Sequence, residues 1–396
     1  MSKLSVQYGF MPYPAVQSTH AAAGPLSGLT FAVKDLIDVR GYPTSGGQAT
    51  ILAKSGIKET TAPTVQKLLD SGAELVGKAI TEELAFSIVG SNAHFGAPIN
   101  SANPDRYTGG SSSGSAAVVA AGLVDFALGT DTGGSVRAPA SNCGLIGIRP
   151  THGRVSLKGA MDLAPSFDTC GWMTRDMATF VRVADVLLGE DTNPLASKVR
   201  LIEPADVWAE LSPEIAKSLS TPQSKIRDCF TQKETTPVAL GSFDEMLTHF
   251  RSIQGFEAWA TYGQFILEDH PVLGEGIAAR FEISRQVTRA QADAGREFRK
   301  KFQDHIDAIL KNDGVLLIPT MTEVSPLRGT PEPALDQYRA NTFRILCIAG
   351  HGALPQITLP VADHQGARLG LSLVGPRGSD HSLVKLAKQV MQAFGG

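Results

Sequence analysis

Short apolar runs alternate with helix-like segments along the first part of the chain, and this alternation constrains the fold more than any other feature. Residues 29–33 (LTFAV), 73–77 (AELVG) and 124–128 (VDFAL) are predicted strands. Residues 63–69 (PTVQKLL), with proline at the start, and 115–122 (SAAVVAAG) are predicted helices. Alternating strands and helices favour an α/β fold around a largely buried sheet.

The middle of the chain has a different character. It is richer in charge and in helix-forming residues, and it ends in an amphipathic stretch from about Ile277 to Leu310. The apolar spacing of that stretch is not a sustained heptad, which predicts a solvated helix packed by one face rather than a coiled coil. Buried-strand patterns return at residues 315–320, 357–360 and 369–374, and a final helix is predicted at 382–394.

No low-complexity linker separates these parts. We therefore predict a single domain over residues 1–396, with a core formed by residues 20–190 and 312–396 and a helical insertion at about 191–311.

Composition narrows the classes of partner. Thirty-six Lys and Arg against 39 Asp and Glu give a net charge of −3, which argues against a nucleic-acid partner because phosphate backbones require a concentrated basic face. No apolar run approaches the roughly 18 residues that a membrane span needs. The scattered cysteines (Cys143, Cys170, Cys229, Cys347) and nine histidines match no metal-ligand spacing. We expect a cytoplasmic protein without metal or cofactor, as a monomer or homodimer.

Two Gly/Ser-rich segments stand out, at residues 109–115 (GGSSSGS) and 131–137 (DTGGSVR). A flexible linker would not be flanked so closely by strand and helix patterns. Neither segment matches a phosphate-binding loop. Ser112 satisfies the G-x-S-x-G pattern of a nucleophile elbow, but the preceding residues have loop composition where that motif needs a strand.

Another interpretation is a serine nucleophile activated by lysine. A neutral lysine can accept a serine proton when apolar surroundings lower its pKa. Lys34 directly follows the apolar run 29–33 and fits that role. It could equally be a surface lysine or a structural partner of Asp35 or Asp38, and the residues alone leave these alternatives open.

Residues 25–39 (PLSGLTFAVKDLIDV) resemble the lysine motif of the amidase signature family, and residues 109–151 resemble its glycine/serine signature. Ser135 lies 24 residues after Ser111, as in the family pattern. The resemblance continues at 166–171, 316–320 and 371–376, and so covers most of the chain apart from its helical middle. It implies one α/β domain with a large mixed, twisted sheet covered by helices on both faces.

The resemblance also implies a Ser–cis-Ser–Lys triad. Ser135 would be the nucleophile, Ser111 the bridging serine after a cis peptide bond, and Lys34 the base. An acyl-enzyme would form on Ser135 and yield a carboxylate plus ammonia or an amine. Backbone N–H groups of the turn at Thr132, Gly133, Gly134 and Ser135 would form the oxyanion hole. Ser112 and Asp131 are expected to support this site, although local loop hydrogen bonds would explain them as well.

The sequence predicts the substrate-binding residues less sharply than the catalytic ones. Proximity to the motifs marks five candidates, namely Arg137, Phe95, Phe167, Asp168 and Trp172. Arg137 could steer an acidic substrate or form a structural ion pair with Asp168. The chain resembles compact amidases that act on arylacetamides such as indole-3-acetamide, so a small or aryl(acet)amide is expected. The alternatives are a glutamine-hydrolysing amidotransferase subunit and a non-catalytic amidase-like binding module.

Overall fold

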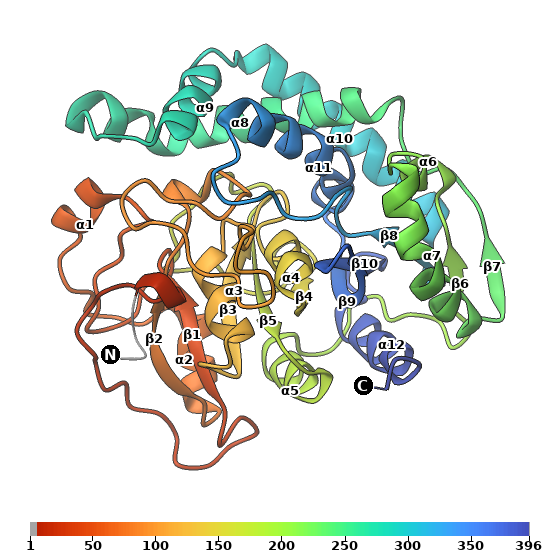
Figure 1. Ribbon diagram of the computed structural model, residues 1–396, viewed down its shortest axis with the longest axis horizontal. Helices are drawn as coiled ribbons and strands as arrows, with labels where there is room; N and C mark the ends of the chain where they lie inside the picture. Colours follow the sequence, from red (N-terminus) through yellow and green to blue (C-terminus); the bar gives the residue numbers. More distant parts are fainter. Residues whose placement is uncertain (1–5, 396) are drawn as a thin grey trace.

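A ten-stranded mixed sheet runs through the molecule in the computed structural model, which describes residues 6–395 (Figure 1). The strands at one end of the sheet, β2 to β3, are parallel, those in the centre are antiparallel, and β8, β6 and β7 are parallel again. From edge to edge the order is β2 (Glu74–Ala79), β1 (Thr30–Lys34), β3 (Phe126–Asp131), β5 (Thr169–Thr174), β4 (Ile146–Arg149), β9 (Gln356–His364), β10 (Ala367–Val374), β8 (Gly314–Pro319), β6 (Arg200–Ile202) and β7 (Gln232–Glu234).

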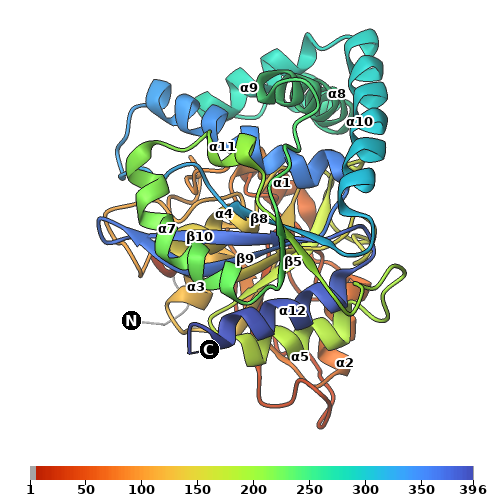
Figure 2. The same cartoon turned by 90° about the vertical axis from the view of Figure 1, so that its right-hand side faces the viewer.

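Helices cover both faces of this sheet. Figure 2 shows α8, α9, α10 and α11 gathered on one side, with α2, α5 and α12 on the other. The α-helices are α1 (Ala49–Ser55), α2 (Pro63–Asp70), α3 (Ser113–Ala120), α4 (Arg137–Cys143), α5 (Met177–Leu187), α6 (Ala205–Trp208), α7 (Pro213–Asp228), α8 (Phe243–Asp269), α9 (Glu275–Arg285), α10 (Arg289–Leu310), α11 (Glu332–Gly352) and α12 (Asp380–Gln392), with short 3-10 turns η1 (Val6–Tyr8) and η2 (Glu83–Ala85).

The parallel strands β1 and β3 position the functional residues. They pair from Phe31 with Phe126 to Val33 with Leu128, so their carboxyl ends open at the same edge of the sheet. The residues of β1 after Thr30 and all those of β3 are buried. Polar side chains at these strand ends, such as Lys34, are therefore held inside the protein rather than in solvent.

The predicted α/β fold with a large mixed sheet and helices on both faces is confirmed. The region 191–311 is mostly helical, but it also contains β6 and β7, which extend the same sheet beyond β8. It is therefore not a purely helical insertion.

The amphipathic stretch from Ile277 to Leu310 is two helices rather than one. Helix α9 ends at Arg285, and α10 begins at Arg289 with a capping box between Thr288 and Gln291. Such a box satisfies the exposed N–H groups of a new helix end and so favours a break at this point.

Candidate active site

Lys34 is a fully buried lysine whose hydrogen bonds go to hydroxyl groups. Its Nζ donates to Ser111 Oγ at 2.7 Å and to Thr130 Oγ1 at 2.8 Å. Burial lowers the pKa of Lys34 to about 7, although the carboxylates of Glu82 and Asp131 act in the opposite direction. The neutral amine is thus available near neutral pH. The sequence analysis did not identify Thr130 as a partner of Lys34. The one feature that could have indicated this role is its position near the end of β3, the strand beside β1.

The two aspartates that follow Lys34 have other partners. Asp35 forms a buried ion pair with Lys78 at 2.7 Å, and Asp38 accepts from Thr44 Oγ1 at 2.8 Å. Lys34 is therefore neither a surface lysine nor the ion-pair partner of these two residues.

Ser111 is held at the start of the first Gly/Ser segment. The peptide bond between Gly110 and Ser111 is cis, as the resemblance implied. The Ser111 carbonyl accepts from the N–H of Glu82 at 3.0 Å and from Thr81 Oγ1 at 3.2 Å. A Cβ atom on Gly110 would lie 1.9 Å from Glu82 Oε2, so any other residue before this serine would force the buried side chain of Glu82 to move.

Ser135 lies in the second Gly/Ser segment, between β3 and α4. Its carbonyl accepts from the N–H of Ser112 at 3.3 Å, which joins the two segments. The Ser112 hydroxyl donates to the carbonyl of Thr130 at 3.2 Å. Ser112 therefore contributes hydrogen bonds that hold the loops together, and its side chain points to backbone rather than to a base.

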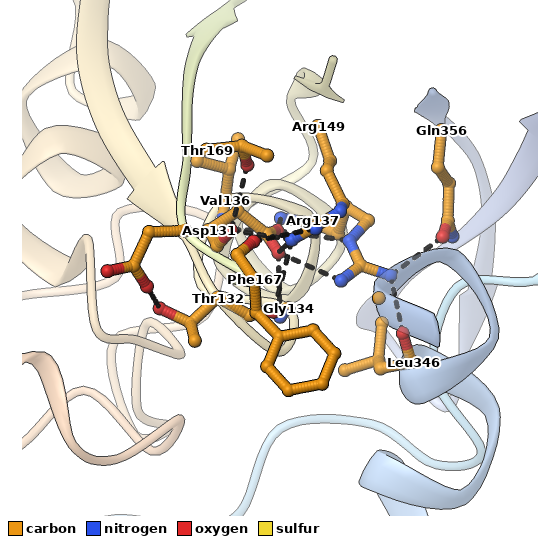
Figure 3. Close-up of polar contacts among 12 residues, drawn as sticks. Asp131, Thr132, Gly134, Val136, Arg137, Arg149, Phe167, Thr169, Leu346 and Gln356 are labelled. Carbon is orange, nitrogen blue, oxygen red and sulfur yellow. Dashed lines mark hydrogen bonds and ion pairs between the residues drawn. The ribbon is translucent and has the colours of Figure 1, made fainter. Parts of the chain in front are cut away.

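Asp131 anchors the turn that carries Ser135 (Figure 3). It is buried and pairs with Arg137 at 2.8 Å and with Arg149 at 3.0 Å. Burial alone would raise its pKa, but the two guanidinium groups hold the pKa of this carboxyl well below its usual range. Its oxygens also accept from the N–H groups of Gly134 at 2.8 Å and Val136 at 3.1 Å.

This arrangement corrects the predicted oxyanion hole. The N–H of Gly134 already donates to Asp131. Of the four predicted oxyanion donors, Gly134 is therefore not free to bind a substrate oxygen. The N–H groups of Thr132, Gly133 and Ser135 have no acceptor assigned among residues 6–395. These three remain available to a substrate oxygen.

Arg137 is not placed to meet a substrate. Its side chain is fully buried and, besides Asp131, it donates to the carbonyl of Leu346 at 2.9 Å and to Gln356 Oε1 at 2.7 Å (Figure 3). The predicted ion-pair partner Asp168 instead accepts from Thr132 Oγ1 at 2.5 Å. Arg149, which sequence reasoning missed, completes the network by donating to the carbonyls of Asp131, Thr132 and Phe167.

Comparison with known proteins then decides the family. The family model described as Amidase matches residues 14–223, more than half of the chain. The chain belongs to the amidase signature family. It is 37% identical to Amidase 1 of Arabidopsis thaliana over 93% of this chain and 94% of that protein, and 34% identical to Amidase 1 of Oryza sativa subsp. japonica over 93% and 91%.

A solved structure described as an amidase agrees with this assignment. It superposes with a TM-score of 0.81 at 27% identity and covers 93% of this chain and 85% of that one. The protein is thus an amidase, an enzyme that hydrolyses amide C–N bonds.

The amidase has a cavity of about 560 Å³ that reaches Thr132, Gly133 and Ser135. Its other walls come from η2 and from α8, α9 and α11, including the aromatic side chains of Phe86, Phe250 and Phe343. Of these elements, η2 and α11 lie within stretches that were expected to belong to the core, whereas α8 and α9 lie in the region 191–311. The residues that line the cavity therefore come in similar numbers from the region 191–311 and from the stretches that were expected to form the core.

None of the five predicted substrate-binding residues lines this cavity. Phe167 is buried behind Phe250, with ring centroids 4.5 Å apart. Trp172 is buried in the core against Phe180, at 5.4 Å. Arg137 and Asp168 are engaged as described, and Phe95 lies in the loop after η2 beside His94. Proximity to a motif in sequence did not predict which side chains face the open space.

The described residues were also searched for a metal site and for a membrane-spanning helix. In the described part of the chain, no three His, Cys, Asp or Glu side chains are clustered as a metal site would require. No helix within residues 6–395 combines the length and apolar character needed to cross a membrane.

Proposed function

We propose that Ser135 attacks the amide carbonyl and becomes the acylated residue, with Ser111 and neutral Lys34 as its proton relay. The observation that carries this proposal is the 2.7 Å contact between Lys34 Nζ and Ser111 Oγ, at a lysine whose pKa burial lowers to about 7. A lysine held charged by a carboxylate could not act as a base, whereas a desolvated one can. Ser135 is the serine of this region that borders the cavity.

The reaction begins with proton transfer. As Ser135 Oγ bonds to the amide carbon, its proton passes to Ser111 Oγ, and the Ser111 proton passes to Lys34 Nζ. The C–N bond then breaks, and the relay returns the proton to the departing nitrogen. Water attacks the acyl-enzyme with the same relay as base, which releases the carboxylate and restores Ser135.

The oxygen of the tetrahedral intermediate would be bound by the N–H groups of Thr132, Gly133 and Ser135. One such donor is worth about 3–4 kcal/mol of barrier in other acyl-transfer enzymes. Apolar side chains pack on this turn, including Phe250 and Phe343 over Gly133, and a dry environment strengthens these hydrogen bonds.

We propose a small aryl amide, of the arylacetamide type, as the substrate. The cavity volume of about 560 Å³ is in the range of small-molecule sites, and three phenylalanines, Phe86, Phe250 and Phe343, offer surfaces for an aromatic ring. The resemblance to compact indole-3-acetamide hydrolases supports the same class.

The test measures ammonia released from phenylacetamide, indole-3-acetamide, hexanamide and glutamine, together with labelling by a fluorophosphonate. We expect the aryl amides to be hydrolysed fastest and the label to map to Ser135 by mass spectrometry. Ser135→Ala should lose the label and at least about four orders of magnitude in kcat. Ser113→Ala is the matched control and should keep both, because it removes a neighbouring buried hydroxyl that has no hydrogen-bond partner among residues 6–395.

Other results would overturn the proposal. Faster hydrolysis of glutamine than of any aryl amide would indicate the glutaminase alternative. Neither turnover nor labelling in a folded protein would indicate a binding module. Labelling at Ser112 that persists in Ser135→Ala would point to a different nucleophile.

A further inference from the structure

The loop of residues 82–91, which contains η2, holds the start of the first Gly/Ser segment, and we call it the cradle loop. Three backbone hydrogen bonds, each 3.0 Å long, join the loop to this segment: the N–H of Gly109 to the carbonyl of Val89, the N–H of Gly110 to the carbonyl of Ile88, and the N–H of Glu82 to the carbonyl of Ser111. Three successive residues, the last of which is the partner of Lys34, are thus bound by one loop.

The side chain of Glu82 spans the inside of the cradle loop. Its Oε1 accepts from the N–H of Ser91 at 3.3 Å, at the far end of the loop. Its Oε2 is the atom nearest to the position that a Cβ atom on Gly110 would take, so the carboxyl group packs on this glycine. The carboxyl group therefore connects the two ends of the loop and rests against the residue before Ser111.

This carboxyl group is buried without a close positive charge to balance it. Glu82 is fully buried, and its Oε2 has no hydrogen-bond partner among residues 6–395. Two arginines act on it from α9 and α11, but both bind other groups, namely Arg280 the carbonyl of Phe86 at 2.7 Å, and Arg339 the carboxylates of Glu332 at 2.8 Å and Asp336 at 2.6 Å. Burial raises the pKa of Glu82, because an ionised carboxylate in such a place loses its hydration and gains little in return.

We propose that Glu82 is a positioning residue for Ser111 and that it acts as the neutral carboxylic acid, so that it closes the cradle loop without placing a negative charge near Lys34. This inference rests on the proposed function, in which Lys34 must be neutral to accept the proton of Ser111. An ionised Glu82 would favour the charged form of Lys34 and would therefore oppose the relay. The proton on Oε2 can be shared with the hydroxyl of Ser87, which lies close to this carboxyl group and is likewise buried without a partner among residues 6–395.

Two variants test the positioning role, with kcat and KM measured for the fastest of the four amides. Glu82→Leu fills a similar volume but has no polar group for Ser91, and it should lower kcat by about 10- to 100-fold with KM nearly unchanged, because a displaced Ser111 impairs proton transfer. Glu82→Gln has an acceptor, a donor and no charge, as the neutral acid does, and it should recover kcat to within about fivefold of the wild type.

Two further measurements test the charge of Glu82. The rise of kcat/KM with pH should occur at the same pH in the wild type and in Glu82→Gln, since both side chains are uncharged. The infrared difference spectrum between these two proteins at pH 7 should contain the carbonyl band of a protonated carboxylic acid. A rise that moves to lower pH by about one unit or more in Glu82→Gln, or carboxylate bands in the spectrum, would show that Glu82 is ionised and would overturn the inference.

Glu203→Leu is the matched control. Glu203 is also buried, but it pairs with Arg227 at 2.8 Å and lies next to β6, towards the opposite end of the sheet from β1. This variant should leave kcat and KM as in the wild type, and urea unfolding verifies that each variant is folded. If Glu82→Leu does not fold, Glu82→Asp replaces it, because the shorter side chain keeps the acid but withdraws it from Ser91.

Wild-type kcat in a folded Glu82→Leu or Glu82→Asp would overturn the positioning role and leave the proposed function intact. The proposed function fails separately, if a fluorophosphonate does not label Ser135 in the wild type.

Discussion

Lys34 Nζ lies 2.7 Å from Ser111 Oγ, and both side chains are completely shielded from solvent. The amine thus has a hydroxyl partner where a buried lysine would ordinarily need a carboxylate. The pair joins β1 to the first Gly/Ser segment, and the protonation state of the amine has measurable consequences.

The first consequence of the protonation state of Lys34 is that the rate depends on pH. Burial lowers the pKa of Lys34 to about 7, and the neutral amine is the active form in the proposed mechanism, so kcat/KM should rise with pH through about 7 and level off above about pH 8. The measurement is kcat/KM for phenylacetamide between pH 5 and 10. A rate that is constant between pH 6 and 8 would contradict a lysine base with this pKa.

The same pKa shift has a cost in stability. Since the pKa of Lys34 is about 7 when folded and 10.5 as its ordinary value, the unfolded chain binds more protons between these limits, and stability should rise with pH across that window. Lys34→Met removes the cost, so at pH 7 the free energy of unfolding should increase by about 1–3 kcal/mol, with the gain vanishing near pH 10.

Urea unfolding at pH 7 and pH 10 measures this difference. Lys301→Met is the control, because Lys301 is 67% exposed and should show no such dependence on pH. A Lys34→Met variant that is less stable than the wild type at pH 7 would contradict the expected sign.

The hydroxyl of Thr132 should matter for kcat rather than for KM. It donates to Asp168 at 2.5 Å and so orients the turn whose N–H groups bind the reacting oxygen in the proposed mechanism. Thr132→Val removes this bond without changing volume and should lower kcat by about 10- to 100-fold with KM nearly unchanged, since the lost alignment acts in the transition state. Thr132→Ser, which retains the donor, should keep most of the activity. Equal losses in the two variants would indicate a packing role instead.

The carboxylate of Asp131 should contribute strongly to the free energy of unfolding. In Asp131→Asn, the buried guanidinium groups of Arg137 and Arg149 lose their counter-charge, and the free energy of unfolding should fall by about 3–5 kcal/mol. Asp363→Asn, at a carboxylate that is 49% exposed and paired with Arg368, should change it by less than about 1 kcal/mol. Similar unfolding midpoints for the two variants would show that the buried network is not needed.

The α/β class and the family could be predicted from the sequence, as could the places of strands β1, β2, β3, β8, β9 and β10 and of helices α2, α3 and α12. The lysine and serines of the signature were chosen by the same reasoning. These features depend on short-range patterns: apolar periodicity, Gly/Ser segments beside strands, and Lys34 directly after an apolar run. The chemistry needed at such positions leaves few residue types that could serve.

The remaining features were decided only by the tertiary structure. Arg137 pairs with Asp131 rather than Asp168, Arg149 joins the same carboxylate, and the N–H of Gly134 is already occupied. The cavity takes most of its lining from α8, α9 and α11, more than 100 residues after Ser135. Which partner a buried charge finds, and which rings border a nucleophile, depends on how distant segments pack, and no local pattern in the chain records that packing.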